Sequence, residues 1–207
     1  MSVQPVPQIT FDDWLRGERA AMEGRSEYVA GEVFAMAGGS EEHNLIVTNV
    51  VGELRAQLKR QPCRVYPSDM KVRISSAEVG AYPDVMVICG DRAFYDDRRD
   101  VVTNPQLIVE VLSESTEAYD RGQKFAHYRA LESLEAYLLI AQNRVCVDLY
   151  LRQDDGSWNL RSYAHLNDVV ELPMIHAHLE LSEVYDKLDL ASPPRPPSVQ
   201  DARQPLP

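Results

Sequence analysis

The stretch that decides the fold is LIVEVL, Leu107–Leu112, in which one carboxylate interrupts five aliphatic side chains. Successive side chains of a β-strand point to opposite faces, so this run is apolar on both faces apart from Glu110. Strands with this pattern lie inside a sheet whose two faces are both covered. We therefore expect Glu110 to lie in a buried strand, on the face that carries Ile108 and Leu112.

A glutamate in such a strand needs a compensating group. Burying an ionised carboxylate alone costs several kcal/mol, so a metal ion, a lysine or arginine, or a raised pKa must offset the loss of water. Two interpretations of Glu110 follow: a functional carboxylate, or one half of a structural ion pair with an arginine.

Asp84 opens a second buried run, Asp84–Cys89, directly after Tyr82-Pro83. If this strand neighbours Leu107–Leu112, Asp84 and Glu110 converge on one spot. Two such carboxylates repel each other unless a divalent cation lies between them, and Mg²⁺ is the usual oxygen-ligated ion. The alternative is that Asp84 only bonds local backbone amides at the start of its strand.

The remaining hydrophobic patterns predict helices and strands on both sides of these two runs. The expected helices are Phe11–Met22 after a Thr10 and Asp13 capping box, Asn44–Arg60 after a Ser40 cap, and Asp120–Glu132. The expected strands are a hairpin over Ser26–Ala37, then Arg64–Ile74, Ala136–Ala141, Val145–Leu151 and Trp158–Tyr163. Together they predict an α/β fold with a mixed central sheet flanked by helices, preceded by an N-terminal helix and hairpin.

The length of 207 residues fits one domain with a substantial core. Residues 1–8 and the Pro-rich segment 191–207 carry few apolar side chains, so we expect disordered tails around a domain at 9–190. The chain has no apolar run long enough to span a membrane and no signal-peptide pattern, which predicts a cytoplasmic protein. Cys63, Cys89 and Cys146 are far apart, and we expect reduced cysteines that fill the core.

The charge balance limits the classes of partner. There are 32 acidic residues against 21 lysines and arginines, a formal net charge of −11. Tight binding of nucleic acid normally depends on lysines and arginines that neutralise phosphates, so a broad basic face is excluded. Any binding of nucleic acid must therefore be local, weak or assisted by a metal.

Several other polar residues are candidates for the same site. Lys124 lies in the helix after the Glu110 strand and could reach back to the carboxylates, although a solvated helix lysine is the alternative. Tyr128, one turn later, is expected to pack with a satisfied hydroxyl. Glu27 and His43 flank the first hairpin. Glu27 could supply a third acidic ligand. His43 could cap the next helix or lie on the surface, or alternatively bind a metal, a phosphate or water. Lys71 is expected to be a solvated strand lysine, with a substrate contact as the alternative. The charged run at 91–100 is expected to be a solvated, mobile loop, with substrate gating as the alternative.

These motifs, in this order, resemble the Uma-type restriction endonuclease family of the PD-(D/E)XK nuclease superfamily. The resemblance extends from about Ile9 to Leu188 and is carried by ITFDDWL at Ile9–Leu15, EYVAGEV at Glu27–Val33, His43, PDV at Pro83–Val85, VEVLSEST at Val109–Thr116 and DRGQK at Asp120–Lys124, followed by Tyr128.

The resemblance implies a restriction-endonuclease-like core that cleaves DNA with Mg²⁺, for which Mn²⁺ could substitute. It makes Asp84 and Glu110 the metal ligands, with the carbonyl of Val111 as a third. Leu112 stands where the superfamily has its motif lysine, and Lys124 would take that role.

The resemblance further implies DNA and a divalent metal as partners, and a homodimer because duplex cleavage needs two strand cuts. A catalytically silent binding or regulatory module is the alternative, which the charge of −11 and the missing motif lysine favour. A small-molecule hydrolase that uses the same carboxylates is a third possibility.

Overall fold

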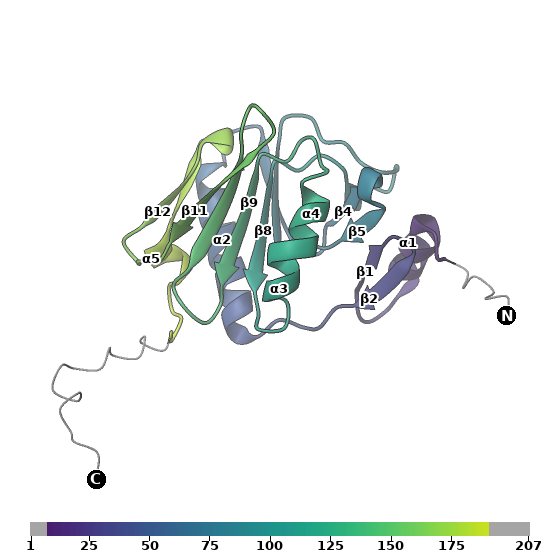
Figure 1. The fold of residues 1–207 in the computed structure, drawn as a ribbon, viewed down its shortest axis with the longest axis horizontal. Coiled ribbons are helices and arrows are strands. Elements are labelled where there is room, and N and C mark those ends of the chain that lie inside the picture. The colour runs from purple at the N-terminus through teal and green to yellow at the C-terminus, as the bar shows by residue number, and fades with distance from the viewer. Residues whose placement is uncertain (1–7, 191–207) are drawn as a thin grey trace, which may run out of the picture.

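The computed structural model describes residues 8–190, so the predicted tails lie outside the described residues except for Gln8. Its helices are α1 (Phe11–Ala20), α2 (Glu41–Gln57), α3 (Glu117–Tyr119), α4 (Phe125–Tyr128) and α5 (Leu181–Val184), and a π-helical turn, Asp120–Lys124, joins α3 to α4. Its strands are β1 (Ser26–Val29), β2 (Glu32–Ala35), β3 (Cys63–Pro67), β4 (Lys71–Ile74), β5 (Val79–Ala81), β6 (Val85–Cys89), β7 (Val101–Val102), β8 (Leu107–Leu112), β9 (Ala136–Ala141), β10 (Val147–Arg152), β11 (Trp158–Tyr163), β12 (Val169–Leu172) and β13 (Ala177–Glu180) (Figure 1). None of the helices within residues 8–190 has the length and apolar character that crossing a membrane requires.

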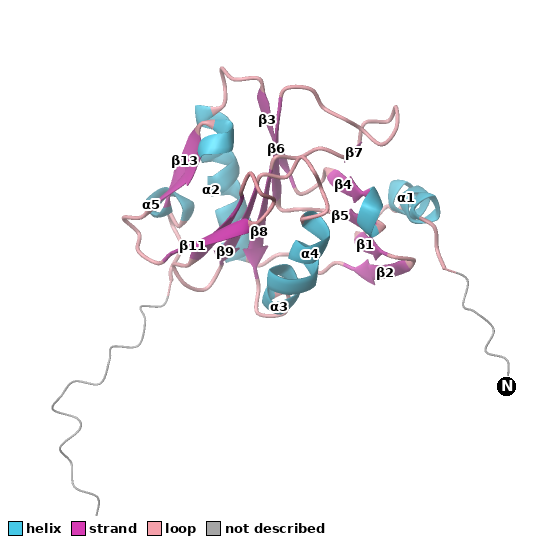
Figure 2. Cartoon of the chain, turned by 45° about the horizontal axis from the view of Figure 1, so that its top comes forward, coloured by secondary structure: helices cyan, strands magenta, loops and turns pink. Residues whose placement is uncertain are grey.

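A six-stranded sheet forms the centre of the molecule, with the order β11-β10-β9-β8-β6-β3 (Figure 2). Strand β8 pairs antiparallel with β6 and parallel with β9, so the sheet is mixed, as predicted. All six residues of β8 are buried. The strand that carries Glu110 is therefore an inner strand, which confirms the expectation from its apolar pattern.

Different elements cover the two faces of this sheet. Helix α2 and the β12–β13 hairpin pack on the face that carries Val85 and Val109. Helix α4 and a second sheet, of order β2-β1-β5-β4-β7, pack on the face that carries Ile108 and Leu112. Glu110 shares the second face by strand parity, so it points toward α4.

Helix α2 forms where apolar residues recur at steps of three and four. It buries Ile46, Val50 and Leu54 completely against the sheet, and each such burial contributes roughly 1.5–3 kcal/mol. At its start, the Ser40 hydroxyl accepts a hydrogen bond from the His43 backbone N–H at 3.2 Å. This cap fixes where the first turn of α2 begins, and thus where His43 lies.

Helix α1 packs on the second sheet through aromatic rings. Phe11 and Trp14 approach β5 at Gly80, where a Cβ atom would lie 2.5 Å from Trp14 and 2.7 Å from Phe11. Glycine is therefore required at this position by close packing. The predicted Thr10 cap is present, since its hydroxyl accepts from the Asp13 N–H at 3.2 Å.

The single strand expected at Arg64–Ile74 is wrong. A turn after Pro67, closed by a hydrogen bond from the Met70 N–H to the Pro67 carbonyl at 3.2 Å, divides it into β3 and β4. The two strands belong to different sheets. Proline at the end of β3 lacks the N–H that a continuous ladder would need.

The expectation that Lys71 is solvated is also wrong. Lys71 is buried, with its Nζ 3.3 Å from an Asp100 carboxylate oxygen and over the ring of Tyr82. The run at 91–100 is largely exposed, as expected, and two of its aspartates, Asp96 and Asp100, form ion pairs with Arg19 of α1. These ion pairs join segments distant in sequence, so no local pattern revealed them.

The expectation of three reduced cysteines is corrected as well. The antiparallel register of β3 and β6 places Cys63 directly opposite Cys89, and the two form a disulfide. Only Cys146 is free, and it is half-buried. The pairing depends on the register of two strands and is invisible in the spacing of the cysteines.

The packing of α1 on β5 predicts the cost of adding one methyl group. Gly80→Ala should lower the free energy of unfolding by about 1–3 kcal/mol, because the new Cβ would overlap the aromatic rings above it. The matched control is Gly17→Ala, where a Cβ meets nothing within 4 Å and α1 should be stabilised by up to about 1 kcal/mol. Urea denaturation measures both values, and equal stability of Gly80→Ala and the wild type would contradict this packing.

Candidate active site

The sheet brings Asp84 and Glu110 together where β6 begins. The ladder pairs Val85 with Val109, so the next step along each strand places Asp84 opposite Glu110. Strand β8 continues beyond this point without a partner from β6. The Asp84 carboxylate takes the partner's place, since its Oδ2 accepts the Val111 backbone N–H at 2.7 Å. The predicted convergence of the two carboxylates is thus present.

The carbonyl of Val111 lies on the same side of β8 as Asp84. The N–H and C=O groups of one strand residue point to the same neighbour, and the Val111 N–H points to Asp84. The next carbonyl, that of Leu112, accepts from the Gln142 N–H on the β9 side at 3.3 Å. Three oxygen-bearing groups, from Asp84, Glu110 and Val111, therefore occur around the start of β6.

Lys124 reaches Glu110 from the helix above the sheet. Its Nζ lies 3.0 Å from Glu110 Oε1, 3.1 Å from Glu27 Oε1 and 3.5 Å from Asp120 Oδ1. The residue is only 8% exposed, so the solvated alternative for this lysine is wrong. One ammonium group is shared by carboxylates from β1, β8 and the π-helical turn.

The spacing of the helical segment explains this contact. Asp120, Lys124 and Tyr128 follow one another at steps of four, which places them on one face. The Tyr128 hydroxyl donates to Glu110 Oε1 at 2.8 Å, as expected for a packed tyrosine with a satisfied hydroxyl. Phe125 anchors the segment by stacking on Tyr137, with ring centroids 5.2 Å apart.

Burial and like charge perturb the ionisation of this cluster. Burial removes water from the Glu110 carboxylate and raises its pKa. The attraction of Lys124 lowers this pKa, whereas the repulsion of Asp84, Asp120 and Glu27 raises it further, and the net shift is upward. Burial raises the pKa of Asp120 in the same direction. For Lys124, burial disfavours the charge, but the surrounding carboxylates outweigh it and raise the pKa. Lys124 is therefore kept in its charged form by the carboxyl groups around it.

His43 binds Asp84 from the first turn of α2. Its Nε2 lies 3.1 Å from Asp84 Oδ2. Burial lowers the pKa of His43, and the bond to Asp84 outweighs that and raises it. Its Nδ1 is buried without a hydrogen-bond partner among residues 8–190 and lies against Gly39, where a Cβ would be 2.6 Å away. The contact with Asp84 places the His43 side chain in the candidate site rather than on the open surface.

Glu27 reaches the cluster from β1, across from the helical segment. It is buried, and its Oε1 lies near Lys124 but has no hydrogen bond among the described residues. Every side chain predicted for the site is thus found in one cluster. Asp120 belongs to it too and was not predicted, although its place four residues before Lys124 was a signal for it.

The charges of the cluster fit a divalent cation. Four carboxylates, those of Glu27, Asp84, Glu110 and Asp120, face one lysine and one histidine. The hydrogen bonds above use Asp84 Oδ2 and Glu110 Oε1, which leaves the second oxygen of each for a further ligand. Carboxylate and carbonyl oxygens are the ligands that Mg²⁺ prefers. Within residues 8–190 no three His, Cys, Asp or Glu side chains form a ready metal site, so the set needs the Val111 carbonyl or water.

The chain is similar to known proteins over most of its length. A family model described as "Uma2: Putative restriction endonuclease" matches residues 10–184. Two uncharacterized proteins of Synechocystis sp., slr1290 and sll1609, are each 36% identical, over 87% and 83% of this chain and 93% and 96% of their own lengths.

A crystal structure from Anabaena variabilis, titled as a putative nuclease, shares the fold. It superimposes with a TM-score of 0.70 at 17% identity and covers 86% of this chain and 97% of its own. At that identity the likeness shows the architecture alone. The extent of the family match and the two relatives together show that this chain belongs to the Uma2 family of restriction-endonuclease-like proteins.

Proposed function

We propose that this protein is a Mg²⁺-dependent endonuclease that hydrolyses DNA phosphodiester bonds, with Mn²⁺ as a possible substitute. The observation that carries the proposal is the convergence of Asp84 and Glu110 at the start of β6, beside the buried Lys124. The family match supports a nuclease, and the PD-(D/E)XK resemblance supports these two carboxylates as the reactive pair.

Asp84, Glu110 and the carbonyl of Val111 are the groups that would hold the metal. A bound Mg²⁺ would supply a water of lowered pKa as nucleophile and neutralise charge on the phosphate under attack. The Val111 N–H and His43 fix the Asp84 carboxylate from two directions. Tyr128 and Lys124 fix Glu110 in the same way.

Lys124 has a second role in the proposal. Its ammonium group lies 3.0 Å from Glu110 Oε1 and would stabilise the negative charge that gathers on the phosphate during attack. A lysine on the helix replaces the motif lysine that position 112 lacks, since Leu112 is buried and apolar. Asp120 and Glu27 hold the Lys124 side chain in this position.

A DNA duplex requires two cuts, so we propose that two copies act together as a homodimer. A catalytically silent binding module is the competing function. The net charge of −11 and the leucine at position 112 favour it, whereas the buried surplus of carboxylates around Lys124 favours the endonuclease. The two functions differ in whether the carboxylates bind a metal.

Nicking of supercoiled plasmid in Mg²⁺ or Mn²⁺ tests the reaction. Asp84→Asn and Glu110→Gln should each lower the nicking rate by about 100-fold or more, because each removes a charge that holds the metal. The matched control is Glu32→Gln, which neutralises an exposed carboxylate on β2 and should nick at the wild-type rate. Equal rates in the wild type and Asp84→Asn would reject this assignment.

Calorimetric titration with Mg²⁺ separates the enzyme from the silent module. The wild type should release or absorb heat of binding, and the double variant Asp84→Asn, Glu110→Gln should give none while its circular dichroism stays that of a folded protein. A wild-type protein that gives no heat at millimolar Mg²⁺ would favour the silent module and contradict the metal site.

A further inference from the structure

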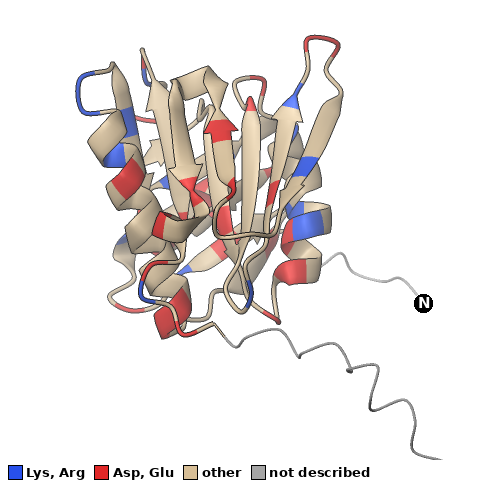
Figure 3. Ribbon diagram, turned by 90° about the vertical axis from the view of Figure 1, so that its left-hand side faces the viewer, with Lys and Arg blue, Asp and Glu red and all other residues tan. Residues whose placement is uncertain are grey.

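The charges beside the candidate active site do not favour DNA. Helix α2, whose first turn carries His43, begins with two exposed glutamates, Glu41 and Glu42. Figure 3 shows red residues at this end of α2 and blue residues at its other end and in the turn after it. The ammonium group of Lys124 is already shared by carboxylates. Since cations that neutralise phosphates normally supply the affinity for DNA, binding at this site needs a contact that does not depend on charge.

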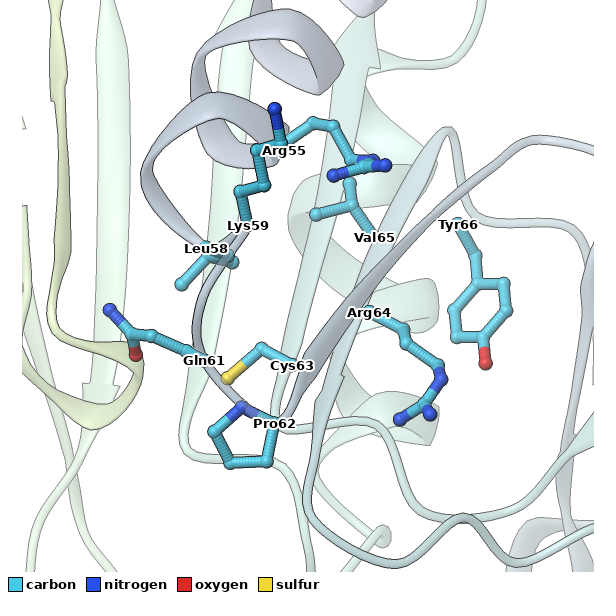
Figure 4. Close-up of a pocket in the computed structure, with 9 residues that line it drawn as sticks. All are labelled: Arg55, Leu58, Lys59, Gln61, Pro62, Cys63, Arg64, Val65 and Tyr66. Atoms are coloured by element: carbon cyan, nitrogen blue, oxygen red, sulfur yellow. The ribbon is translucent and has the colours of Figure 1, made fainter.

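The basic residues at the other end of α2 do not supply a common binding face. Arg55, Lys59 and Arg64 are among the residues that line a pocket between α2 and β3. Figure 4 shows Arg55 and Lys59 on the helix side of β3, and Arg64 on its other side. These cations thus lie on opposite faces of the central sheet and do not converge on the carboxylates of the candidate site.

Phe34 is an exposed aromatic residue next to those carboxylates. It lies on β2, the outer strand of the second sheet, and is 50% exposed. The ladder pairs it with Glu27 of β1, and opposite residues of an antiparallel pair share one face, with Cβ atoms about 5 Å apart. Glu27 reaches Lys124 from this face, with 3.1 Å between Oε1 and Nζ. Phe34 therefore borders the candidate site and keeps half of its surface open to solvent.

The neighbouring residue of β2 points the other way. Val33 pairs with Tyr28, which packs with the aromatic rings of α1, so Val33 lies on the α1 face of the second sheet. Aromatic residues favour strands, and this would account for a phenylalanine anywhere on β2. An exposed apolar side chain on an outer strand also promotes pairing between chains, however, and Phe34 belongs to none of the three hydrophobic clusters of the described chain.

A second aromatic side chain lies near the same glutamate. Tyr119, at the end of α3, is half-buried. Burial raises the pKa of its hydroxyl to about 12, and among the neighbouring charges Glu27 adds most to this shift. Aromatic groups from β2 and α3 therefore both occur around Glu27, at the border of the candidate site.

We propose that the Phe34 ring stacks on a base of the DNA next to the bond that is cut. This inference rests on the proposed function, since it names how the substrate is held beside the reacting centre. Stacking needs no positive charge and is open to every base, because each base has a flat π face. It therefore suits a protein of net charge −11. A base inside a duplex is covered by its neighbours, so the inference makes DNA with unpaired bases the preferred substrate.

Binding of a fluorescein-labelled single-stranded oligonucleotide, followed by anisotropy at low salt without divalent metal, tests the inference apart from catalysis. Phe34→Ala and Phe34→Leu should each bind about 5-fold or more weakly, whereas Phe34→Tyr keeps the ring and should bind as the wild type does. The matched control is Val33→Ala, which shortens a residue of the same strand that is 41% exposed on the opposite face, and it should leave binding unchanged.

An oligonucleotide of the same length with abasic sites separates stacking from contacts with the backbone. The wild type and Phe34→Ala should bind it equally, because it offers no base to stack on. Equal anisotropy curves of the two proteins with the natural oligonucleotide, whether or not it binds, would overturn the inference. Sedimentation in which Phe34→Ala turns a dimer into a monomer would also overturn it, because the ring would then contact a second copy of the chain.

Plasmid nicking in Mg²⁺ keeps the two proposals distinct. Phe34→Ala should raise KM by about the same factor as it weakens binding, because the stacked base is held equally before and during the reaction. A Phe34→Ala variant that binds and nicks as the wild type does would overturn the stacking contact and leave the endonuclease standing. A wild-type protein that binds the oligonucleotide through Phe34 but never nicks DNA would overturn the endonuclease and support the stacking contact.

Discussion

The buried ammonium group of Lys124 holds this structure's candidate site together. It joins Glu27 of the N-terminal hairpin, Glu110 of the central sheet and Asp120 of its own helical segment. Without a cation, these carboxylates could not stay ionised side by side, because each one has lost its water and repels the others. Lys124 therefore links the helical segment and β1 to the central sheet by charge, in addition to the stacking of Phe125 on Tyr137 and the pairing of β1 with β5.

The central sheet provides the second constraint. Because β6 begins one residue after Asp84 while β8 continues, one backbone N–H of an inner strand is left for a side chain to bind. Asp84 binds it, and this fixes a carboxylate beside Glu110 at the point where the ladder opens. Acidic charge is thus concentrated at this end of β6.

Much of this arrangement could be predicted from the sequence, because it depends on strand parity and helical spacing. The apolar run around Glu110 predicted an inner strand, and the position of Asp84 before a second such run predicted that the carboxylates would meet. The sequence could not show contacts set by tertiary packing. Examples are the Cys63–Cys89 disulfide, which needs the register of β3 on β6, and the burial of Lys71 against Asp100. Asp120 was missed because a carboxylate at a helix start is ordinarily solvated.

The central claim, that Lys124 stabilises the fold through Glu110, is tested by a double-mutant cycle of unfolding free energies in guanidinium chloride. Lys124→Met should cost about 3–5 kcal/mol, because it leaves buried carboxylates without their cation. Adding Glu110→Gln to that variant should restore part of the loss, with a coupling energy of about 1–3 kcal/mol. Two substitutions whose costs simply add would contradict the account.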